Sequence, residues 1–125
     1  MHIQLEATEN TSIEAYSDHE VRINNQVYSH NLLVSRAGII TNWSIDSIDK
    51  LTPETLDSLM TKSIDSQPEI ILIGHNGLSK LPPPTTSDYL SKQRIALESM
   101  SIGAACRTYN VLLSEHRNIV LGIIF

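Results

Sequence analysis

The chain has 125 residues, a length that fits a single domain spanning residues 1–125. Hydrophobic residues make up 41% and charged residues 18%, a composition that excludes an intrinsically disordered chain. The formal net charge is −5 and the nine Lys and Arg residues are scattered, which argues against nucleic acid as a partner.

The single cysteine and the N-terminus indicate where the protein works. Cys106 has no partner for an internal disulfide, and residues 1–6 lack the basic and apolar regions of a secretory signal. The longest apolar runs, residues 70–73 and 119–125, are far shorter than the roughly 20 residues that span a bilayer. We therefore expect a cytoplasmic protein with no targeting segment and no membrane span.

Between residues 12 and 43 the apolar residues recur with a period of two, which indicates short antiparallel strands. These residues are Ile13, Ala15, Val21, Ile23, Val27, Leu32, Val34, Ile39 and Ile40. Asn24-Asn25 and Ala37-Gly38 mark chain reversals, because Asn and Gly tolerate positive φ. The segment predicts a meander of three or four strands.

A helix is predicted to begin after Thr52, which suits the N-cap position, with Pro53 first in the helix and Glu54 near its positive end. Apolar residues follow at helical spacing and are expected to form its buried stripe, namely Leu56, Leu59, Met60 and Ile64. Residues 69–73 are a β-branched run without alternation, which predicts a central strand covered on both faces.

Residues 74–98 predict a turn, a helix and a second strand. Gly74-His75-Asn76-Gly77 is expected to close the central strand as a turn, and the three prolines of residues 81–84 to form a rigid extended lip. Thr86 or Ser87 is suited to cap a short helix over residues 88–94, and residues 95–98 follow as a strand. This order is a βαβ unit, so its two strands are expected to be parallel.

The last third of the chain predicts a helix over residues 102–115, capped by Ser101, and a final strand over residues 119–125. The residues expected to face inward are Ala105, Tyr109, Leu112 and Leu113. A separate polar row consists of Arg107, Asn110, Ser114 and Arg117. The small residues 103–106 allow the first turns to approach the sheet closely.

The segment Arg107-Thr108-Tyr109-Asn110, with its flanking residues 98–100 and 115–118, resembles the Mth-domain family of unknown biochemical activity. That family includes an adipogenesis-associated protein and the third assembly factor of mitochondrial respiratory complex I. The resemblance continues through residues 23–25, 28–34, Trp43, 51–54, 69–74 and 81–83. It implies a three-layer β/β/α fold of the α/β class, with an N-terminal antiparallel β-meander and a mixed sheet with βαβ crossovers.

This chain departs from the pattern of the family at two places. Residues 74–77 stand where the family has a Gly-Thr-Gly turn, and Met100-Ser101-Ile102 replaces a Met-Asp-Thr segment. Both departures fall at the strand ends where a ligand site is expected.

The carboxyl ends of the two predicted parallel strands should lie side by side, and ligands of open α/β sheets bind beside such ends. A crevice is expected there, with a helix N-terminus that favours an anion. The candidate ligand-binding residues are Gly74, His75, Asn76, Gly77, Ser101, Arg107 and Asn110. Alternatively, Arg107 and Asn110 fix neighbouring loops by hydrogen bonds to backbone carbonyls, and His75 with Asn76 forms a turn tip.

Other chemistry finds little support in the sequence. Residues 74–77 lead into prolines and not into a helix, so the phosphate-loop motif fails. The histidines show no metal-ligand spacing with one another or with Cys106, so neither a metal nor a cofactor is expected. Cys106 near a helix N-terminus is a conceivable nucleophile, but buried cysteine is more common. No nucleophile elbow or catalytic triad is recognisable.

Two functions remain. The first is a non-catalytic protein-interaction module, similar to the assembly factors, that binds a protein partner through the Arg107 face and the lip. The second is a small-anion or metabolite-binding protein, conceivably an enzyme, that uses the crevice at Ser101, Arg107 and residues 74–77.

Overall fold

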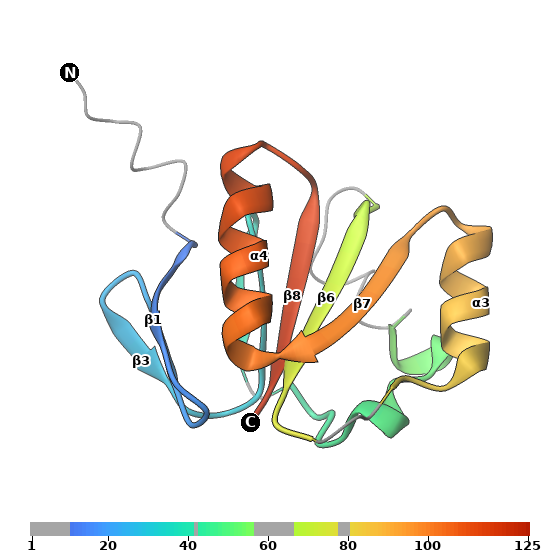
Figure 1. The fold of residues 1–125 in the computed structure, drawn as a ribbon, viewed down its shortest axis with the longest axis horizontal. Helices are drawn as coiled ribbons and strands as arrows, with labels where there is room; N and C mark the ends of the chain where they lie inside the picture. Colours follow the sequence, from blue (N-terminus) through green and yellow to red (C-terminus); the bar gives the residue numbers. More distant parts are fainter. Residues whose placement is uncertain (1–10, 42, 57–66, 78–80) are drawn as a thin grey trace.

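A computed structural model describes residues 11–41, 43–56, 67–77 and 81–125, and these form two β-sheets with helices packed on them (Figure 1). A three-stranded sheet is ordered β1-β2-β3, from β1 (Ile13–Tyr16), β2 (Val21–Ile23) and β3 (Gln26–Tyr28). A five-stranded sheet is ordered β5-β4-β8-β6-β7, from β4 (Leu32–Ser35), β5 (Gly38–Thr41), β6 (Ile70–His75), β7 (Ala96–Ser101) and β8 (Ile119–Ile124). The helical segments are η1 (Ile48–Lys50), residues 53–56, α3 (Pro84–Lys92) and α4 (Ile102–Ser114).

The five-stranded sheet is mixed. β6 runs parallel to both β7 and β8, whereas β4 is antiparallel to β5 and β8. The predicted βαβ unit is therefore confirmed, with α3 between β6 and β7, and α4 makes a second crossover between β7 and β8. The prediction that residues 69–73 form a central strand covered on both faces is confirmed, because β6 lies between β8 and β7 and its side chains belong to the core clusters on both faces, although β8 occupies the exact middle of the sheet.

The predicted meander exists as the three strands β1 to β3. Asn24 and Asn25, with φ of 55° and 66°, make the tight turn between β2 and β3. The β4–β5 hairpin leaves this sheet, because all four residues of β4 are buried and such a strand needs cover on both faces. By contrast, β2 alternates buried and exposed residues, as a strand with one solvated face does.

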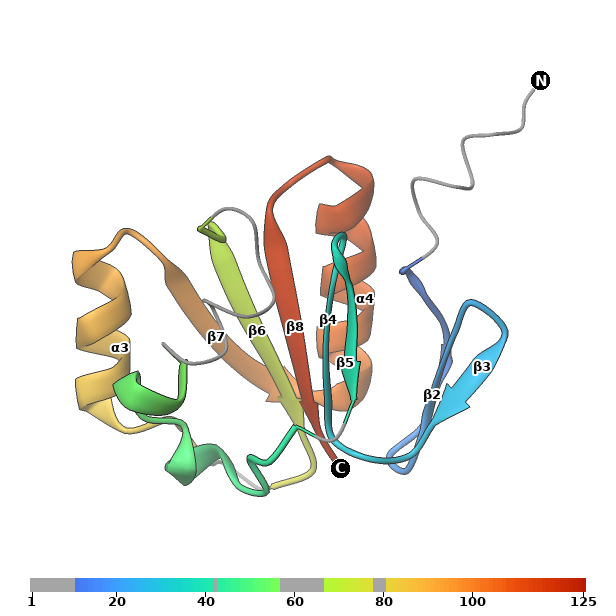
Figure 2. The same ribbon diagram turned by 180° about the vertical axis from the view of Figure 1, so that it is seen from behind.

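The two faces of the five-stranded sheet carry separate hydrophobic clusters. On one face α4 packs against β6 and β8, and β1 of the smaller sheet packs against α4 (Figure 1). The other face is covered by α3 and by residues 43–56, drawn in green in Figure 2. Trp43 belongs to this second cluster and is 6% exposed. The resulting layers agree with the three-layer α/β fold that was expected.

The helix starts follow the sequence signals in two cases out of three. Ser101 caps α4 by accepting the N–H of Ala104 at 3.3 Å. Thr52 and Thr55 exchange backbone-to-hydroxyl hydrogen bonds, which places Pro53 first in its helix as predicted. The predicted stripe residues Leu59, Met60 and Ile64 lie outside the described residues, whereas Leu56 is buried.

The start predicted for α3 is wrong. Neither Thr86 nor Ser87 caps this helix, because it begins earlier, at Pro84, and the lip is correspondingly shorter. Proline at the first helical position loses no hydrogen bond. The Thr86 hydroxyl is buried and donates to the Leu51 carbonyl at 2.6 Å. It therefore ties α3 to the segment that precedes residues 53–56.

Candidate functional site

The carboxyl ends of β6 and β7 lie side by side, as predicted. His75 is paired with Ser101 at the end of both strands, and α4 begins immediately afterwards at Ile102. This arrangement brings Gly74, His75 and Ser101 to one end of the sheet. The ends of β6 and β7 point towards the bottom of Figure 1. Gly74, His75 and Ser101, which were expected to meet at these strand ends, therefore do lie together.

Residues 74 and 75 do not form a turn, and that prediction is wrong. Both belong to β6, and His75 is only 9% exposed. A Cβ on Gly74 would lie 2.9 Å from the Cβ of Ala105 and 3.1 Å from the Cα of Ile102. Glycine is needed here because α4 lies too close to the strand for any side chain at this position. The absence of a side chain lets the strand continue past the helix to His75. Only Asn76 and Gly77 follow the strand as exposed residues.

Three predicted site residues contact the N-terminal part of the described chain. The Asn76 amide donates to the Asp18 carbonyl at 3.0 Å, in the connection between β1 and β2. Asn110 and Arg107 both contact β1, through Ile13 and Tyr16. Asn76, Arg107 and Asn110 thus hold the three-stranded sheet. The alternative to ligand binding was that Arg107 and Asn110 bond backbone carbonyls, and Asn110 does so, whereas Arg107 bonds a side-chain hydroxyl.

Asn110 replaces a neighbouring strand at the outer edge of β1. Its Oδ1 accepts the N–H of Ile13 at 2.8 Å, and its Nδ2 donates to the carbonyl of the same residue at 2.9 Å. A side-chain amide presents an N–H donor beside a C=O acceptor, and a residue of a neighbouring strand presents the same pair of groups. Both backbone groups of an edge-strand residue are therefore satisfied by one side chain.

Arg107 is exposed and lies beside Tyr16. Its Nη1 donates to the Tyr16 hydroxyl at 2.7 Å, and its guanidinium carbon is 5.9 Å from the centre of that ring. Gly103 lies beneath them, since a Cβ there would be 3.0 Å from Tyr16 Cε1 and 3.2 Å from Arg107 Nη1. Val111 is one turn further along α4 and is 56% exposed. Tyr16, Arg107 and Val111 are named the α4 patch below.

Nucleophilic and metal chemistry find no support in the described residues. Cys106 is buried, and this burial raises the pKa of its thiol to about 11, although the charge of Arg107 acts in the opposite direction. Tyr109 is also buried and donates to the Thr11 hydroxyl at 3.2 Å. Over the described ranges, no group of three or more His, Cys, Asp and Glu residues is arranged to hold a metal ion.

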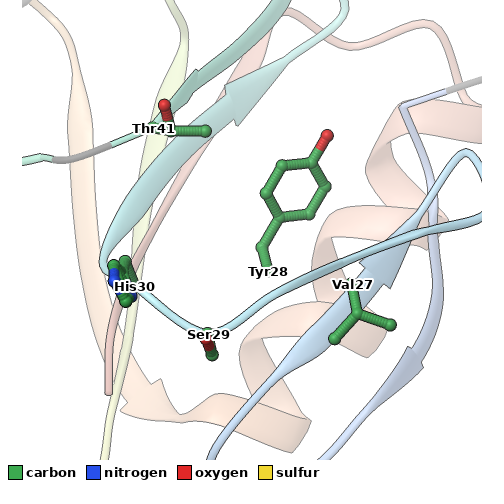
Figure 3. A pocket seen from close by; sticks show the side chains of 5 residues that line it. All are labelled: Val27, Tyr28, Ser29, His30 and Thr41. Atoms are coloured by element: carbon green, nitrogen blue, oxygen red, sulfur yellow. The ribbon is translucent and has the colours of Figure 1, made fainter.

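Two hollows of the described surface involve the three-stranded sheet and none of the predicted site residues. One, of about 250 Å³, is lined by Val27, Tyr28, Ser29, His30 and Thr41 (Figure 3). The other, of about 130 Å³, is lined by Ala15, Tyr16, Ser17, Glu20, Val21, Arg22 and Val27. Sequence reasoning missed both. Val27 lines both hollows, and its apolar character in an alternating pattern carried no sign that it is exposed.

The fold and these surfaces define a small α/β protein in which one helix joins a mixed sheet to a separate three-stranded sheet. The chain belongs to the family described as "Protein of unknown function (DUF498/DUF598)", whose model matches residues 13–124. The resemblance to Mth-domain proteins is confirmed by a solution structure from Bordetella pertussis, a Mth938-like domain. That structure has a TM-score of 0.77 and 21% identity, with 99% of this chain and 90% of that chain covered.

Two curated relatives carry more specific names. The chain is 33% identical over 98 residues to the "13 kDa major membrane protein" of Francisella tularensis subsp. holarctica (strain LVS), a match covering 78% of this chain and 76% of that protein. It is 22% identical over 116 residues to NADH dehydrogenase (ubiquinone) 1 alpha subcomplex assembly factor 3 of Drosophila melanogaster. That match covers 90% of this chain but only 57% of the fly protein. Among the described helices, none has the length and apolarity needed to cross a bilayer.

Proposed function

We propose that the protein is a non-catalytic interaction module that binds a partner protein in the manner of an assembly factor. The relative from Drosophila melanogaster named as an assembly factor supports this function at the level of the family. We further propose that the protein works in the cytoplasm. The bacterial relative is named a membrane protein, and our proposal does not extend that location to this chain.

The α4 patch is the surface that we assign to the partner, and it is the observation that carries the proposal. Tyr16 is 42% exposed and accepts a hydrogen bond from the guanidinium of Arg107, and Val111, one turn further along α4, is 56% exposed. Tyrosine and arginine are enriched at the energetically dominant positions of protein interfaces. Because Arg107 is already held against Tyr16, a partner would find the side chain ordered before binding.

The lip contributes a second apolar contact to the same proposal. Leu81 is 74% exposed, and it precedes three prolines whose φ angles are fixed before a partner binds. An exposed leucine on a rigid segment loses little conformational entropy on binding.

Site-specific cross-linking in native cells tests this function. A photoreactive phenylalanine analogue at position 111 should give one defined protein adduct, and Arg107→Ala should remove it. The same analogue at Ser87, an exposed position of α3, serves as the control. The proposal fails if positions 87 and 111 give the same adducts, or if the adduct at 111 survives Arg107→Ala.

Anion binding at the start of α4 is the second candidate function. The observation in its favour is that Arg107 Nη1 lies over Gly103, in the first turn, where a Cβ would be only 3.2 Å away. A guanidinium beside first-turn N–H groups is a favourable setting for an oxyanion, and it would use Ser101, Arg107 and the neighbouring residues 74–77.

Calorimetric titration with inorganic phosphate tests the second candidate. Arg107→Ala should weaken phosphate binding by roughly 1.5 to 3 kcal/mol, the value of a hydrogen bond to a charged group. Arg107→Lys keeps the charge without the planar fork, so it should restore only part of the affinity. Equal phosphate affinity in the wild type and in Arg107→Ala would end this candidate.

A further inference from the structure

The hollow of about 250 Å³ is lined on one side by the end of β3 and by the connection to β4, namely Val27, Tyr28, Ser29 and His30. Successive side chains of a strand point to opposite faces of the sheet. Val27 and Tyr28 are successive residues of β3, yet both line this hollow. A space that touches both faces must reach around the backbone edge between them. On its other side the hollow is bounded by Thr41, the last residue of β5 (Figure 3). We call this hollow the edge groove.

The edge groove therefore lies between two edge strands that belong to different sheets. β3 is the outer strand of the three-stranded sheet, and β5 is the outer strand of the five-stranded sheet. In an antiparallel ladder, alternate residues point their N–H and C=O groups away from the paired strand. Within the described chain, β3 pairs with β2 on one side and with no strand on the other. An edge of this kind is a template for another extended chain.

The other edges of the two sheets are less open to such an addition. The edge of β1 is occupied by the amide of Asn110, which bonds both backbone groups of Ile13. The edge strand β7 has α3 packed against it and carries the exposed carboxylate of Glu98. Charged side chains on edge strands oppose pairing with another chain.

The lining of the edge groove sets the chemistry of its occupant. Its described lining residues are one valine, one tyrosine, one histidine, one serine and one threonine, with no carboxylate, ammonium or guanidinium among them. Val27 is 57% exposed, which leaves an apolar position for a cross-strand contact. The groove is therefore suited to a chain with an extended backbone. The residue of that chain beside Val27 should be β-branched or aromatic, and the side chain that points into the groove should be uncharged.

We propose that the edge groove binds an extended, uncharged segment of a partner protein by strand addition to β3. Main-chain hydrogen bonds to the edge would supply affinity, and the space beside Tyr28 and Thr41 would select the inward side chain. This inference goes beyond the function proposed above, because it assigns a different surface and specifies the conformation of the bound segment.

Two matched substitutions separate the edge groove from the α4 patch. Val27 and Val111 are the same residue type with nearly equal exposure, 57% and 56%, but they lie on β3 and α4 respectively. Val27→Lys places an ammonium on the edge strand, the device by which natural edges resist pairing. Val111→Lys makes the same change in charge and size on the other surface. Neither position is buried, so both variants should fold.

A phage-displayed library of random heptapeptides, selected on the wild-type protein and counter-selected on Val27→Lys, provides the probe. We expect enriched peptides with alternating β-branched or aromatic residues and no charge in the bound segment. The synthetic peptide should bind Val27→Lys at least about tenfold more weakly than wild type, whereas Val111→Lys should bind it like the wild type. In ¹⁵N spectra, an amide of β3 should become protected from hydrogen exchange on binding.

The inference is overturned if no peptide is enriched, or if the enriched peptides are charged or proline-rich. It also fails if Val111→Lys weakens binding as much as Val27→Lys, or if binding leaves every β3 amide unprotected. Protection of β3 by self-association of the wild-type chain, without peptide, would assign the edge to a second copy and likewise refute a partner segment. None of these results bears on the cross-linking test at position 111, so the two proposals fail independently.

Discussion

Replacing Asn110 with alanine tests whether this side chain serves as a substitute strand. The change removes two hydrogen bonds, of 2.8 and 2.9 Å, to the backbone of Ile13. Each bond contributes about 1 kcal/mol net, and a backbone group left unpaired in a partly buried place adds to the loss. Alanine recovers at most about 0.7 kcal/mol through its higher helix propensity. We therefore expect the free energy of unfolding to fall by roughly 2 kcal/mol.

Urea denaturation followed by tryptophan emission measures this loss, and hydrogen exchange localises it. The Ile13 amide should exchange faster in Asn110→Ala, while amides of β6 and β8 lose protection only through the lower global stability. Ser114→Ala is the control, because Ser114 is exposed on the same helix and its hydroxyl bonds the carbonyl of Val111 within that helix. A loss below about 0.5 kcal/mol for Asn110→Ala, with unchanged exchange at Ile13, would refute the substitute-strand role.

Two further predictions concern the core. Gly122→Ala should destabilise the protein by roughly 1 to 3 kcal/mol, because its Cβ would lie 2.8 Å from Trp43 Cζ3 and 3.1 Å from Ile73 Cδ1. Buried Trp43 should emit at a blue-shifted wavelength in the wild type, and an unchanged urea midpoint in the variant would contradict this packing. Because burial raises the pKa of Cys106 from 9.0 to about 11, the folded state holds this proton more tightly. The resulting stability is complete below pH 9 and is lost as the pH rises towards 11, and denaturation of Cys106→Ala should lack this part of the pH dependence.

The parts of the fold that follow from local chemistry could be predicted from the sequence. The start of α4 was predictable because a serine hydroxyl caps the first turn, and Thr52 with Pro53 indicated the start of the helix over residues 53–56 for a similar reason. The parallel pairing of β6 and β7 followed from the alternation of strand and helix. Each of these features depends on residues that are close together in the chain.

The features that were missed depend on contacts between distant segments. Gly74 and His75 looked like a turn because glycine is common in turns, but the need for glycine comes from Ala105 on α4. The partner of Asn110 is Ile13, which is 97 residues away, and the partner of Arg107 is Tyr16, 91 residues away. No local pattern marks such pairs. The polar row of α4 was recognisable from its spacing, but its partners were not.

Arg107 and Asn110 lie on the same row of α4, but the structure gives them different surroundings, and this difference yields a last prediction. Asn110 is half-buried and bonds backbone groups, whereas Arg107 and Tyr16 are both exposed to solvent. An exposed cation–π contact contributes about 0.5 to 1 kcal/mol, and solvent weakens the accompanying hydrogen bond. In a double-mutant cycle, Arg107→Ala and Tyr16→Phe should therefore show a coupling below about 1 kcal/mol, with Arg107→Ala clearly less destabilising than Asn110→Ala. If Arg107→Ala proves as destabilising as Asn110→Ala, the guanidinium serves the fold and the α4 patch loses its main reason for being assigned to a partner. If instead the stability is nearly unchanged while the adduct at position 111 disappears, the exposed guanidinium serves binding.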